Sequence, residues 1–239
     1  MPNSSIFEEI QCVTLDLDDT LWPVEPTINR AEQALYAWIS EQCSEITNQY
    51  TLEEITAKRI ALGQRREDIA HDVTQLRFCA LRELAEEFNC GEYFAAEGLE
   101  LFRNYRNQVE PYQHSESVLM ELKQHFVLGA ITNGNAQLQH ISLGRLFDFA
   151  ITAEQVGVSK PHRQMFVHAS EYANIELNKI VHIGDSPQTD VLGALNAGCK
   201  AIWFNRKRQA WPGGQTPDGV IHCLSELPEM LTSNVNQNS

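Results

Sequence analysis

Three features of the sequence predict an α/β protein, with a doubly wound, Rossmann-like parallel sheet as its core and an inserted all-helical domain. Short apolar runs rich in β-branched residues alternate with segments of helical periodicity over most of the chain. Acidic and polar residues directly follow several of these runs, where the ligand-binding edge of such a sheet lies. The interval between the first run and the second has helical periodicity throughout, so we interpret it as an insertion.

The first predicted strand covers residues 11–17, which read QCVTLDL. The run is short, apolar and β-branched, which is typical of a strand buried on both faces of a parallel sheet. It ends in a cluster of acids at Asp16, Asp18 and Asp19. We therefore expect these acids at the carboxyl end of a buried strand.

The predicted insertion follows the acids. Apolar residues recur at helical spacing from about residue 25 to residue 109, and Pro111 ends the pattern. The stretch is too long for a simple crossover between two strands. We therefore predict a helical cap domain over residues 23–110, and a core domain formed by residues 1–22 and 111–239.

The rest of the chain alternates between strand and helix, which predicts a parallel sheet covered by helices on both faces. A loop is expected at residues 213–219 and a polar tail at residues 232–239. The predicted strands cover residues 126–132, 149–152, 179–183 and 199–204, and the predicted helices cover residues 115–125, 137–146, 162–173, 189–197 and 224–231.

Length and charge narrow the class of protein. A chain of 239 residues is long enough for one large domain or one domain with an insert. Its net charge of −14 repels a phosphate backbone, so we expect no nucleic acid as a partner. The same field repels a small phosphate ester, so a substrate of that kind needs a local cation.

The sequence shows neither a secretory leader nor a membrane span. Its first ten residues hold two Glu and no Lys or Arg, and no apolar run approaches about 18 residues. We therefore expect a cytoplasmic protein without a membrane partner. The cysteines are scattered without a C-x-x-C pair, which predicts reduced thiols in the core. They are Cys12, Cys43, Cys79, Cys90, Cys199 and Cys223.

The strongest local signal is the run Asp16-Leu17-Asp18-Asp19-Thr20. Three acids in four residues after a buried strand are costly unless something compensates their charge. Two carboxylates held close together by the backbone form a hard oxygen site that suits Mg²⁺. The alternative is a helix N-cap with solvated acids.

Two further clusters supply groups that bind anions. Thr132-Asn133-Gly134 follows a predicted strand and offers a hydroxyl, an amide and an accessible backbone, although an ordinary strand-to-helix turn is the alternative. Lys160 precedes a predicted helix and is one of few cations near a strand end. It is either a phosphate-binding cation or a solvated surface residue.

The last cluster is Gly184-Asp185-Ser186, with Asp190 five residues after Asp185. The predicted strand before it brings Asp185 to the same sheet edge as Asp16, which favours a third metal-binding carboxylate. The alternative is an Asp that caps the following helix.

In this order, the clusters resemble the motifs of phosphatases of the haloacid dehalogenase superfamily, over about residues 10–205. The matching positions are D-x-D-x-T at 16–20, Thr132, Lys160, and G-D-x-x-x-x-D at 184–190. The insertion resembles the C1-type helical cap of that superfamily. The resemblance implies a Mg²⁺-dependent phosphatase that hydrolyses small-molecule phosphate monoesters through an aspartyl phosphate.

The resemblance also implies roles for the acids. Asp16 attacks phosphorus, and Asp18 protonates the leaving alcohol and then activates water. Mg²⁺ is held by a carboxylate oxygen of Asp16, the backbone carbonyl of Asp18, and Asp185. Thr132, Asn133 and Lys160 hold the transferring phosphoryl group. Asp190 then supports the site, for instance by orienting Lys160.

Asp18 distinguishes between two chemistries. Dehalogenases of the superfamily attack carbon and lack an acid two residues after the nucleophile, so the acid at position 18 favours phosphoryl transfer. A dehalogenase and a catalytically silent binding protein are the alternatives. Trp22 follows the first acidic cluster and either shapes the substrate entrance or packs in the interior, and we expect His182 to be a structural or surface residue.

In the cap, Asp72 and Arg77 interrupt an apolar helical pattern. They either lie on a solvated face or grip the leaving group, with Arg77 as donor and Asp72 as acceptor. The segment resembles the cap of bacterial phosphatases that act on FMN and on 5-amino-6-(5-phospho-D-ribitylamino)uracil, a precursor in riboflavin biosynthesis. Nucleotides and sugar phosphates stay open as substrates. We expect a monomer or weak dimer.

Overall fold

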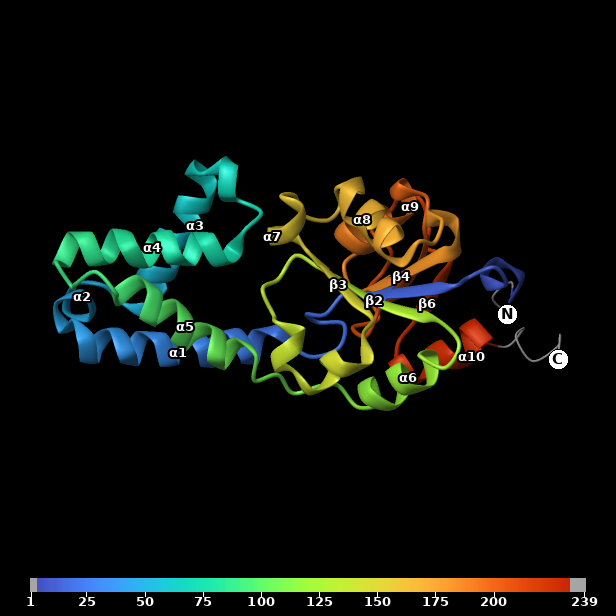
Figure 1. Cartoon of the computed structure of the whole chain (residues 1–239), viewed down its shortest axis with the longest axis horizontal. Coiled ribbons are helices and arrows are strands. Elements are labelled where there is room, and N and C mark those ends of the chain that lie inside the picture. The colour runs from blue at the N-terminus through green and yellow to red at the C-terminus, as the bar shows by residue number, and fades with distance from the viewer. Residues whose placement is uncertain (1–3, 233–239) are drawn as a thin grey trace. The chain divides into compact units, whose positions relative to one another are not determined.

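The computed structural model describes residues 4–232 and divides them into two compact units (Figure 1). The first is an α/β unit made of the described residues up to Pro23, of Pro111–Gly134, and of those from Leu138 on. The second is a helical unit made of Val24–Glu110 and Asn135–Gln137. Residues 135–137 lie within the core domain predicted from the sequence, whereas the structure groups them with the helices.

Six parallel strands form the sheet of the α/β unit, in the order β3-β2-β1-β4-β5-β6. The chain adds β2 and β3 on one side of β1 and then crosses over to add β4, β5 and β6 on the other. This is the strand order of a doubly wound, Rossmann-like sheet, so the predicted fold class is confirmed. The strands are β1 (Cys12–Leu15), β2 (Val127–Thr132), β3 (Phe149–Thr152), β4 (Ile180–Gly184), β5 (Lys200–Phe204) and β6 (Gly219–Ile221).

The direction of winding reverses between β1 and β4. In sheets of this kind, ligands bind beyond the carboxyl ends of the strands at this switch point. Leu15 on β1 pairs with Ala130 on β2 and with Ile183 on β4. Asp16 and Gly184 therefore stand at the same level, and the strand register brings the acids that follow β1 and β4 to one edge.

Helices cover both faces of this sheet, with α8 and α9 on one face and α6 and α10 on the other (Figure 1). On the first face, α8 contributes Met165, Phe166 and Ala169 to the core, and all three are fully buried. They pack against apolar side chains of the strands, which fixes the polar residues of the strand ends relative to the sheet. The helices are α6 (Ser115–Leu122), α7 (Ala153–Val156), α8 (Arg163–Ala173), α9 (Gly193–Ala197) and α10 (Leu227–Thr232).

The helical unit has a core of its own. Leu35 and Ile39 from α1 pack in one cluster with Leu99 and Phe102 from α5. An apolar stripe on each helix faces this cluster, as the helical periodicity of the sequence predicts. The helices are α1 (Val24–Gln42), α2 (Ser44–Gln49), α3 (Leu52–Arg65), α4 (Val73–Phe88) and α5 (Phe94–Arg106).

Some elements differ from the prediction. Residues 137–146 form two 3₁₀ turns, Leu138–His140 and Ser142–Leu146, in place of one helix. Gly144 lies so close to the Leu138 carbonyl that a Cβ would overlap it, a tight approach that only glycine allows. The three-residue strand β6 was missed, because so short a run does not stand out within a polar loop.

The predicted loop at residues 213–219 begins with Gly213 and Gly214, which have φ of 108° and 87°. These angles fall in the left-handed region that glycine adopts most easily, so the chain turns there. The predicted polar tail lies outside the described residues from residue 233 on. Of the helices described, none has the length and apolar character that crossing a bilayer requires.

The prediction that every cysteine is a reduced thiol is wrong for one pair. Cys43 and Cys90 form a disulfide within the helical unit. Cys43 follows α1 and Cys90 lies just after α4, at a sequence separation of 47, so only the packing of the helices brings them together. The other four cysteines are free thiols, and Cys12, Cys79 and Cys199 are buried as predicted.

Close packing between β2 and β3 leads to the first prediction. A Cβ on Gly129 would lie 2.2 Å from Cζ of Phe149, the residue opposite it on β3. Gly129→Ala should therefore lower the free energy of unfolding by about 1–3 kcal/mol, the usual cost of overpacking a core. Urea unfolding followed by circular dichroism measures the change.

The control is Gly63→Ala in α3, where the new Cβ meets the flexible Leu76 side chain at 3.2 Å. Alanine is favoured there by about 1 kcal/mol of helix propensity, so little loss is expected. Adding Phe149→Leu to Gly129→Ala should recover part of the lost stability, because the smaller side chain vacates the space. Wild-type stability in Gly129→Ala would contradict the close contact.

Candidate active site

Asp16 is the first residue after β1, and it is buried. Its backbone N–H donates to the carbonyl of Ile183 at 2.9 Å, which continues the pairing of β1 with β4 by one residue. The side-chain Oδ1 accepts from Nζ of Lys160 at 2.7 Å, and Oδ2 accepts a longer contact of 3.5 Å from the Thr20 hydroxyl. The carboxylate is therefore held at the carboxyl edge of the sheet, at the switch point.

The chain folds back on itself directly after Asp16. The Leu21 N–H donates to the Leu17 carbonyl at 2.8 Å, and the Asp19 N–H donates to the Trp22 carbonyl at 2.7 Å. Asp19 has a φ of 58°, in the left-handed region that Asp tolerates better than most residues. This turn places Asp18 beside Trp22, whose indole N–H donates to Oδ1 of Asp18 at 2.8 Å.

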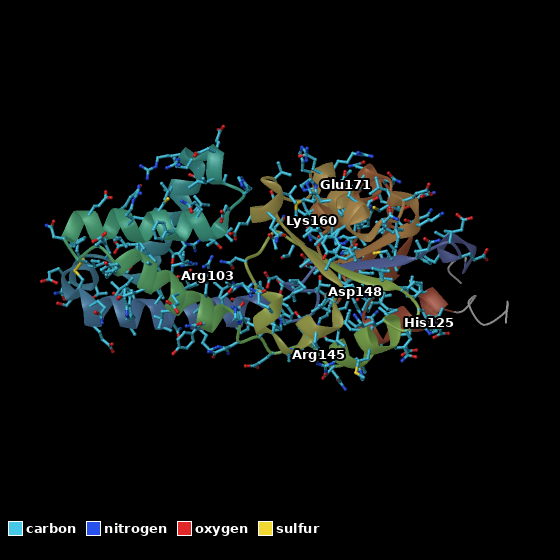
Figure 2. All side chains as sticks on the ribbon, in the orientation of Figure 1. Arg103, His125, Arg145, Asp148, Lys160 and Glu171 are labelled. Atoms are coloured by element: carbon cyan, nitrogen blue, oxygen red, sulfur yellow. A yellow bond between two sulfur atoms is a disulfide. The ribbon has the colours of Figure 1, made fainter. Side chains whose placement is uncertain are left out.

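Lys160 is buried, so the alternative of a solvated surface lysine is excluded. Its ammonium lies 2.7 Å from Oδ1 of Asp16, 2.7 Å from Oδ1 of Asp190, and 2.6 Å from the carbonyl oxygen of Ile131. An ammonium has three N–H donors, and three acceptors surround it here. Figure 2 labels Lys160 in the α/β unit.

Thr132 and Asn133 lie at the end of β2, as predicted. Asn133 bonds the backbone of Lys160 twice, because its Oδ1 accepts from the Lys160 N–H at 2.7 Å and its Nδ2 donates to the Lys160 carbonyl at 3.0 Å. The Thr132 hydroxyl accepts from the Gly134 N–H at 3.0 Å. The side chain of Asn133 therefore positions Lys160, while Thr132 stands at the same edge with a hydroxyl hydrogen to donate.

Asp190 is buried behind Lys160. Its Oδ2 accepts from the Ser186 N–H at 3.0 Å, and its Oδ1 contacts Lys160. Gly184 makes room for it, since a Cβ on Gly184 would lie 2.3 Å from Cγ of Asp190. The glycine before Asp185 is thus required by the packing of Asp190, in addition to any role in the turn.

His182 on β4 also contacts Asp190, with 3.4 Å from Nε2 to Oδ1. Its Nδ1 lies 3.0 Å from the Thr14 hydroxyl. Burial lowers the pKa of His182, so the ring is neutral. Because Asp190 only accepts when ionised, Nε2 carries the hydrogen and Nδ1 accepts from Thr14. This contact was not predicted from the sequence, and the position of His182 two residues before Gly184 is the one signal that could have indicated it.

Asp185 follows β4 and is partly exposed. Its backbone carbonyl accepts from the indole N–H of Trp203 on β5 at 2.8 Å, which fixes the main chain there. Burial and the nearby charges of Asp190 and Asp19 raise the pKa of Asp185 to about 7. The carboxylate is therefore ready to exchange its proton for a cation near neutral pH.

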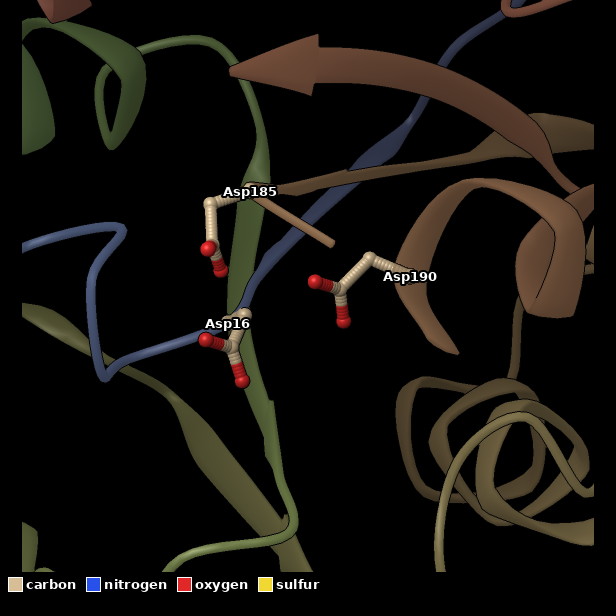
Figure 3. Close-up of side chains that lie close together, drawn as sticks. All are labelled: Asp16, Asp185 and Asp190. Atoms are coloured by element: carbon tan, nitrogen blue, oxygen red, sulfur yellow. The ribbon is translucent and has the colours of Figure 1, made fainter. Parts of the chain in front are cut away.

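Three of the carboxylates meet at this edge (Figure 3). Asp16, Asp185 and Asp190 each offer an oxygen, and these oxygens lie within 4.8 Å of one another. One ammonium, that of Lys160, contacts two of them. When all four groups are ionised, three negative charges face one positive charge, so the cluster has a net charge of −2.

Burial acts against each charge in the cluster. It raises the pKa of Asp16 to about 8, because the attraction of Lys160 does not fully offset it. Burial also opposes the charged form of Lys160, but the carboxylates of Asp16 and Asp190 outweigh it and raise its pKa. For Asp190 burial is again the largest single effect, but the contacts with Lys160 and His182 together outweigh it and lower the pKa. Lys160 and Asp190 therefore form the persistent ion pair, and Asp16 titrates near neutral pH.

A pocket of about 250 Å³ opens beside these acids on the α/β unit. Asp19 and Asp185 line one part of it, and the exposed cations Arg206 and Lys207 line another. The Arg206 guanidinium lies 4.5 Å from the ring centre of Tyr112. These two cations follow β5 and were not singled out from the sequence, although a basic run in so acidic a chain is a usable signal.

In the helical unit, Asp72 and Arg77 make contacts of their own. Asp72 is the N-cap of α4, where its Oδ1 accepts from the Gln75 N–H at 2.8 Å. Arg77 is buried, with Nη1 and Nη2 donating to the two carboxylate oxygens of Glu32 at 3.0 and 2.8 Å. Its Cζ lies 3.4 Å from the ring centre of Phe102. A role of either residue in substrate selection stays a prediction.

Comparisons with known proteins agree with this arrangement. YigB of Escherichia coli (strain K12), a 5-amino-6-(5-phospho-D-ribitylamino)uracil phosphatase, is 31% identical over 93% of the chain and 96% of its own length. (S)-2-haloacid dehalogenase 2 of Pseudomonas sp. (strain CBS-3) is 26% identical over 94% and 96%. The crystal structure of 2-haloacid dehalogenase from Pseudomonas syringae pv. Tomato DC3000 matches with a TM-score of 0.87 and 36% identity, over 94% of this chain and 99% of that one.

The family model of haloacid dehalogenase-like hydrolases matches residues 10–198, which contain β1, the helical insertion and the acids that follow β4. Both phosphatases and dehalogenases are among the relatives, so the family assignment is broader than either activity. Together with the sheet order and the acid cluster at its switch point, the match shows that the chain is an enzyme of the haloacid dehalogenase-like hydrolase family.

Proposed function

We propose that the protein is a Mg²⁺-dependent phosphatase that hydrolyses small-molecule phosphate monoesters through an aspartyl phosphate. One observation carries the proposal. Asp18 stands two residues after the buried Asp16 and close enough to interact electrostatically with it, and Asp16 belongs to the cluster with Asp185, Asp190 and Lys160. A nucleophile and a second acid in this arrangement suit the two proton transfers of phosphate ester hydrolysis.

In the first step, an oxygen of Asp16 attacks phosphorus and the bond from phosphorus to the ester oxygen breaks. Oδ1 of Asp16 is held by Lys160 at 2.7 Å, whereas Oδ2 has the weaker 3.5 Å contact with Thr20. We therefore assign the attack to Oδ2. The leaving alcohol takes a proton from Asp18, which becomes a carboxylate.

In the second step, a water molecule attacks the aspartyl phosphate. Asp18, now charged, accepts a proton from that water, and the phosphorus–oxygen bond to Asp16 breaks. Inorganic phosphate leaves, and Asp16 is again a free carboxylate. The proton that Asp18 gave to the alcohol is thus recovered from water, so the cycle closes.

The donors present fit Mg²⁺. All of them are oxygens, which this hard cation prefers, and a divalent charge balances the two surplus negative charges of the cluster. We assign the metal to carboxylate oxygens of Asp16 and Asp185 and to the backbone carbonyl of Asp18. When bound, the metal neutralises charge between an anionic nucleophile and an anionic ester.

The transferring phosphoryl group needs donors on its other oxygens. The Thr132 hydroxyl stands at the same edge as Asp16, and we assign it to one of them together with Asn133. Lys160, whose three N–H donors already have acceptors, acts there through its positive charge. The side chain of Asn133 forms two hydrogen bonds with the backbone of Lys160, so the two residues act here as one preorganised unit. Asp190 fixes the ammonium from behind.

For the substrate, the relative YigB favours a phosphorylated riboflavin precursor, and FMN is chemically close to it. Nucleotides and sugar phosphates are the competing classes, since a pyrimidine 5'-nucleotidase of Escherichia coli (strain K12), YjjG, is 33% identical over 51% of the chain. The partner is in each case a small phosphate ester. A cytoplasmic location and a monomer or weak dimer stay predictions.

Dehalogenation is the second candidate, because proteins named as haloacid dehalogenases match most of the chain. That reaction has the same first event, attack by Asp16, but on carbon with halide as the leaving group. Halide leaves without taking a proton, so this step does not need Asp18 as a general acid. The acid at position 18 is the reason to prefer phosphate esters.

The test is release of inorganic phosphate with and without Mg²⁺, from FMN, the riboflavin precursor phosphate, nucleoside monophosphates and sugar phosphates. Asp16→Asn should lower kcat/KM for every ester on the order of 10³-fold or more, because the nucleophile is lost. Asp68→Asn, which changes an exposed acid of the helical unit, is the matched control and should keep activity. Halide release from 2-haloacids without phosphate release would instead favour dehalogenation.

Metal binding should depend on pH. Asp185 has a pKa of about 7 and Asp16 a pKa of about 8, and both must lose their protons to bind Mg²⁺. The affinity for Mg²⁺ should therefore rise as the pH increases from about 6 to about 8.5 and level off above that. Titration calorimetry in buffers of different ionisation enthalpy should detect protons released at about pH 7 and almost none at high pH.

Asp185→Asn is the matched variant for this measurement. It should bind Mg²⁺ more weakly and release fewer protons at about pH 7, because one titrating carboxylate is absent. An affinity that stays constant between about pH 6 and 8.5 would contradict the assignment of these two acids to the metal.

A further inference from the structure

Trp22 is fully buried, yet its polar atom is used in a specific way. The indole N–H donates to Oδ1 of Asp18 at 2.8 Å, a short hydrogen bond to the acid that the proposed mechanism needs twice. A buried indole N–H needs an acceptor, and here that acceptor is the side chain of Asp18. The contact therefore restrains the rotatable carboxyl group of Asp18 against the rigid indole of Trp22.

The backbone around this contact is fixed on both sides. Asp18 and Trp22 form an isolated β-bridge, and the Asp19 N–H donates to the Trp22 carbonyl at 2.7 Å. The Leu21 carbonyl accepts from the Tyr112 N–H at 2.8 Å and from the Ser115 hydroxyl at 2.9 Å. The turn that holds Trp22 is thus attached to the start of α6, about ninety residues later in the sequence.

This bond also favours one oxygen of Asp18 as the carrier of its proton. An indole N–H only donates, and the carbonyl oxygen of a carboxylic acid accepts better than its hydroxyl oxygen. The contact at Oδ1 therefore favours Oδ2 as the oxygen that carries the hydrogen. The bond thereby orients the acid as well as holding its rotamer.

We propose that Trp22 is a positioning residue that aims Oδ2 of Asp18 at the leaving-group oxygen of the substrate. This rests on the proposed phosphatase function. Preorganised orientation of a general acid matters most where the leaving group needs its proton. An alkyl alcohol leaves poorly as an alkoxide and needs that proton, whereas nitrophenolate is weakly basic and leaves without it.

The experiment measures kcat/KM of Trp22→Phe for p-nitrophenyl phosphate and for an alkyl phosphate that the wild type hydrolyses. This constant covers the steps up to departure of the leaving group, so the shared hydrolysis of the aspartyl phosphate does not mask the effect. We expect a fall of about 10- to 100-fold for the alkyl ester, which is part of the usual contribution of a general acid, and less than about 3-fold for the aryl ester.

A second variant guards against loss of packing. Site-specific replacement of Trp22 by 3-benzothienylalanine keeps the ring size but puts sulfur in place of the N–H, and it should give the same selective loss. Trp211→Phe is the matched control, because the indole nitrogen of Trp211 has no hydrogen-bond partner within the described structure. It should leave the ratio of the two kcat/KM values unchanged.

Asp18→Asn completes a double-mutant cycle. It should show the same selectivity against the alkyl ester at larger magnitude, and adding Trp22→Phe to it should cause little further loss. Equal losses for both esters in Trp22→Phe and in the benzothienyl variant, or no loss for either, would overturn the proposal. A wild type that hydrolyses neither ester would instead overturn the phosphatase function, and the role of Trp22 with it.

Discussion

The buried ammonium of Lys160 between Asp16 and Asp190 is the interaction on which the rest of the site depends. Charges in a protein interior are costly unless each is paired and hydrogen-bonded. Here the ammonium has three acceptors, counting the Ile131 carbonyl, and Asp190 has a backbone N–H on its other oxygen. Asp16, the proposed nucleophile, is thus held by a network whose members would each be unstable alone.

The parallel sheet makes this network possible. Because β1 lies between β2 and β4, the ends of three neighbouring strands supply Asp16, Asn133 and Asp185 at one level. Glycine at position 184 then leaves space for Asp190, and Asn133 holds the backbone of Lys160. The strand order therefore determines which polar groups meet, and local packing determines how closely.

The sequence was sufficient for the features that depend on local pattern. Apolar runs followed by acids identified β1 and β4, and hence the edge where Asp16 and Asp185 meet. It was not sufficient for the contact between Trp22 and Asp18, because the sequence does not show which acceptor a buried indole N–H meets until the turn is folded. The disulfide of Cys43 with Cys90 depends in the same way on how helices pack, which residue spacing alone does not encode.

The structure also refines the role of Lys160. In an acidic chain, a phosphate ester needs a cation, and Lys160 was the predicted one. Its three donors, however, already face Asp16, Asp190 and the Ile131 carbonyl, so its charge is largely used within the protein. When all of its acids are ionised, the cluster has two surplus negative charges, and these repel a phosphate. A divalent cation at Asp16 and Asp185 would neutralise that surplus, so in the proposed mechanism it would allow a phosphate ester to approach as well as assist the chemistry.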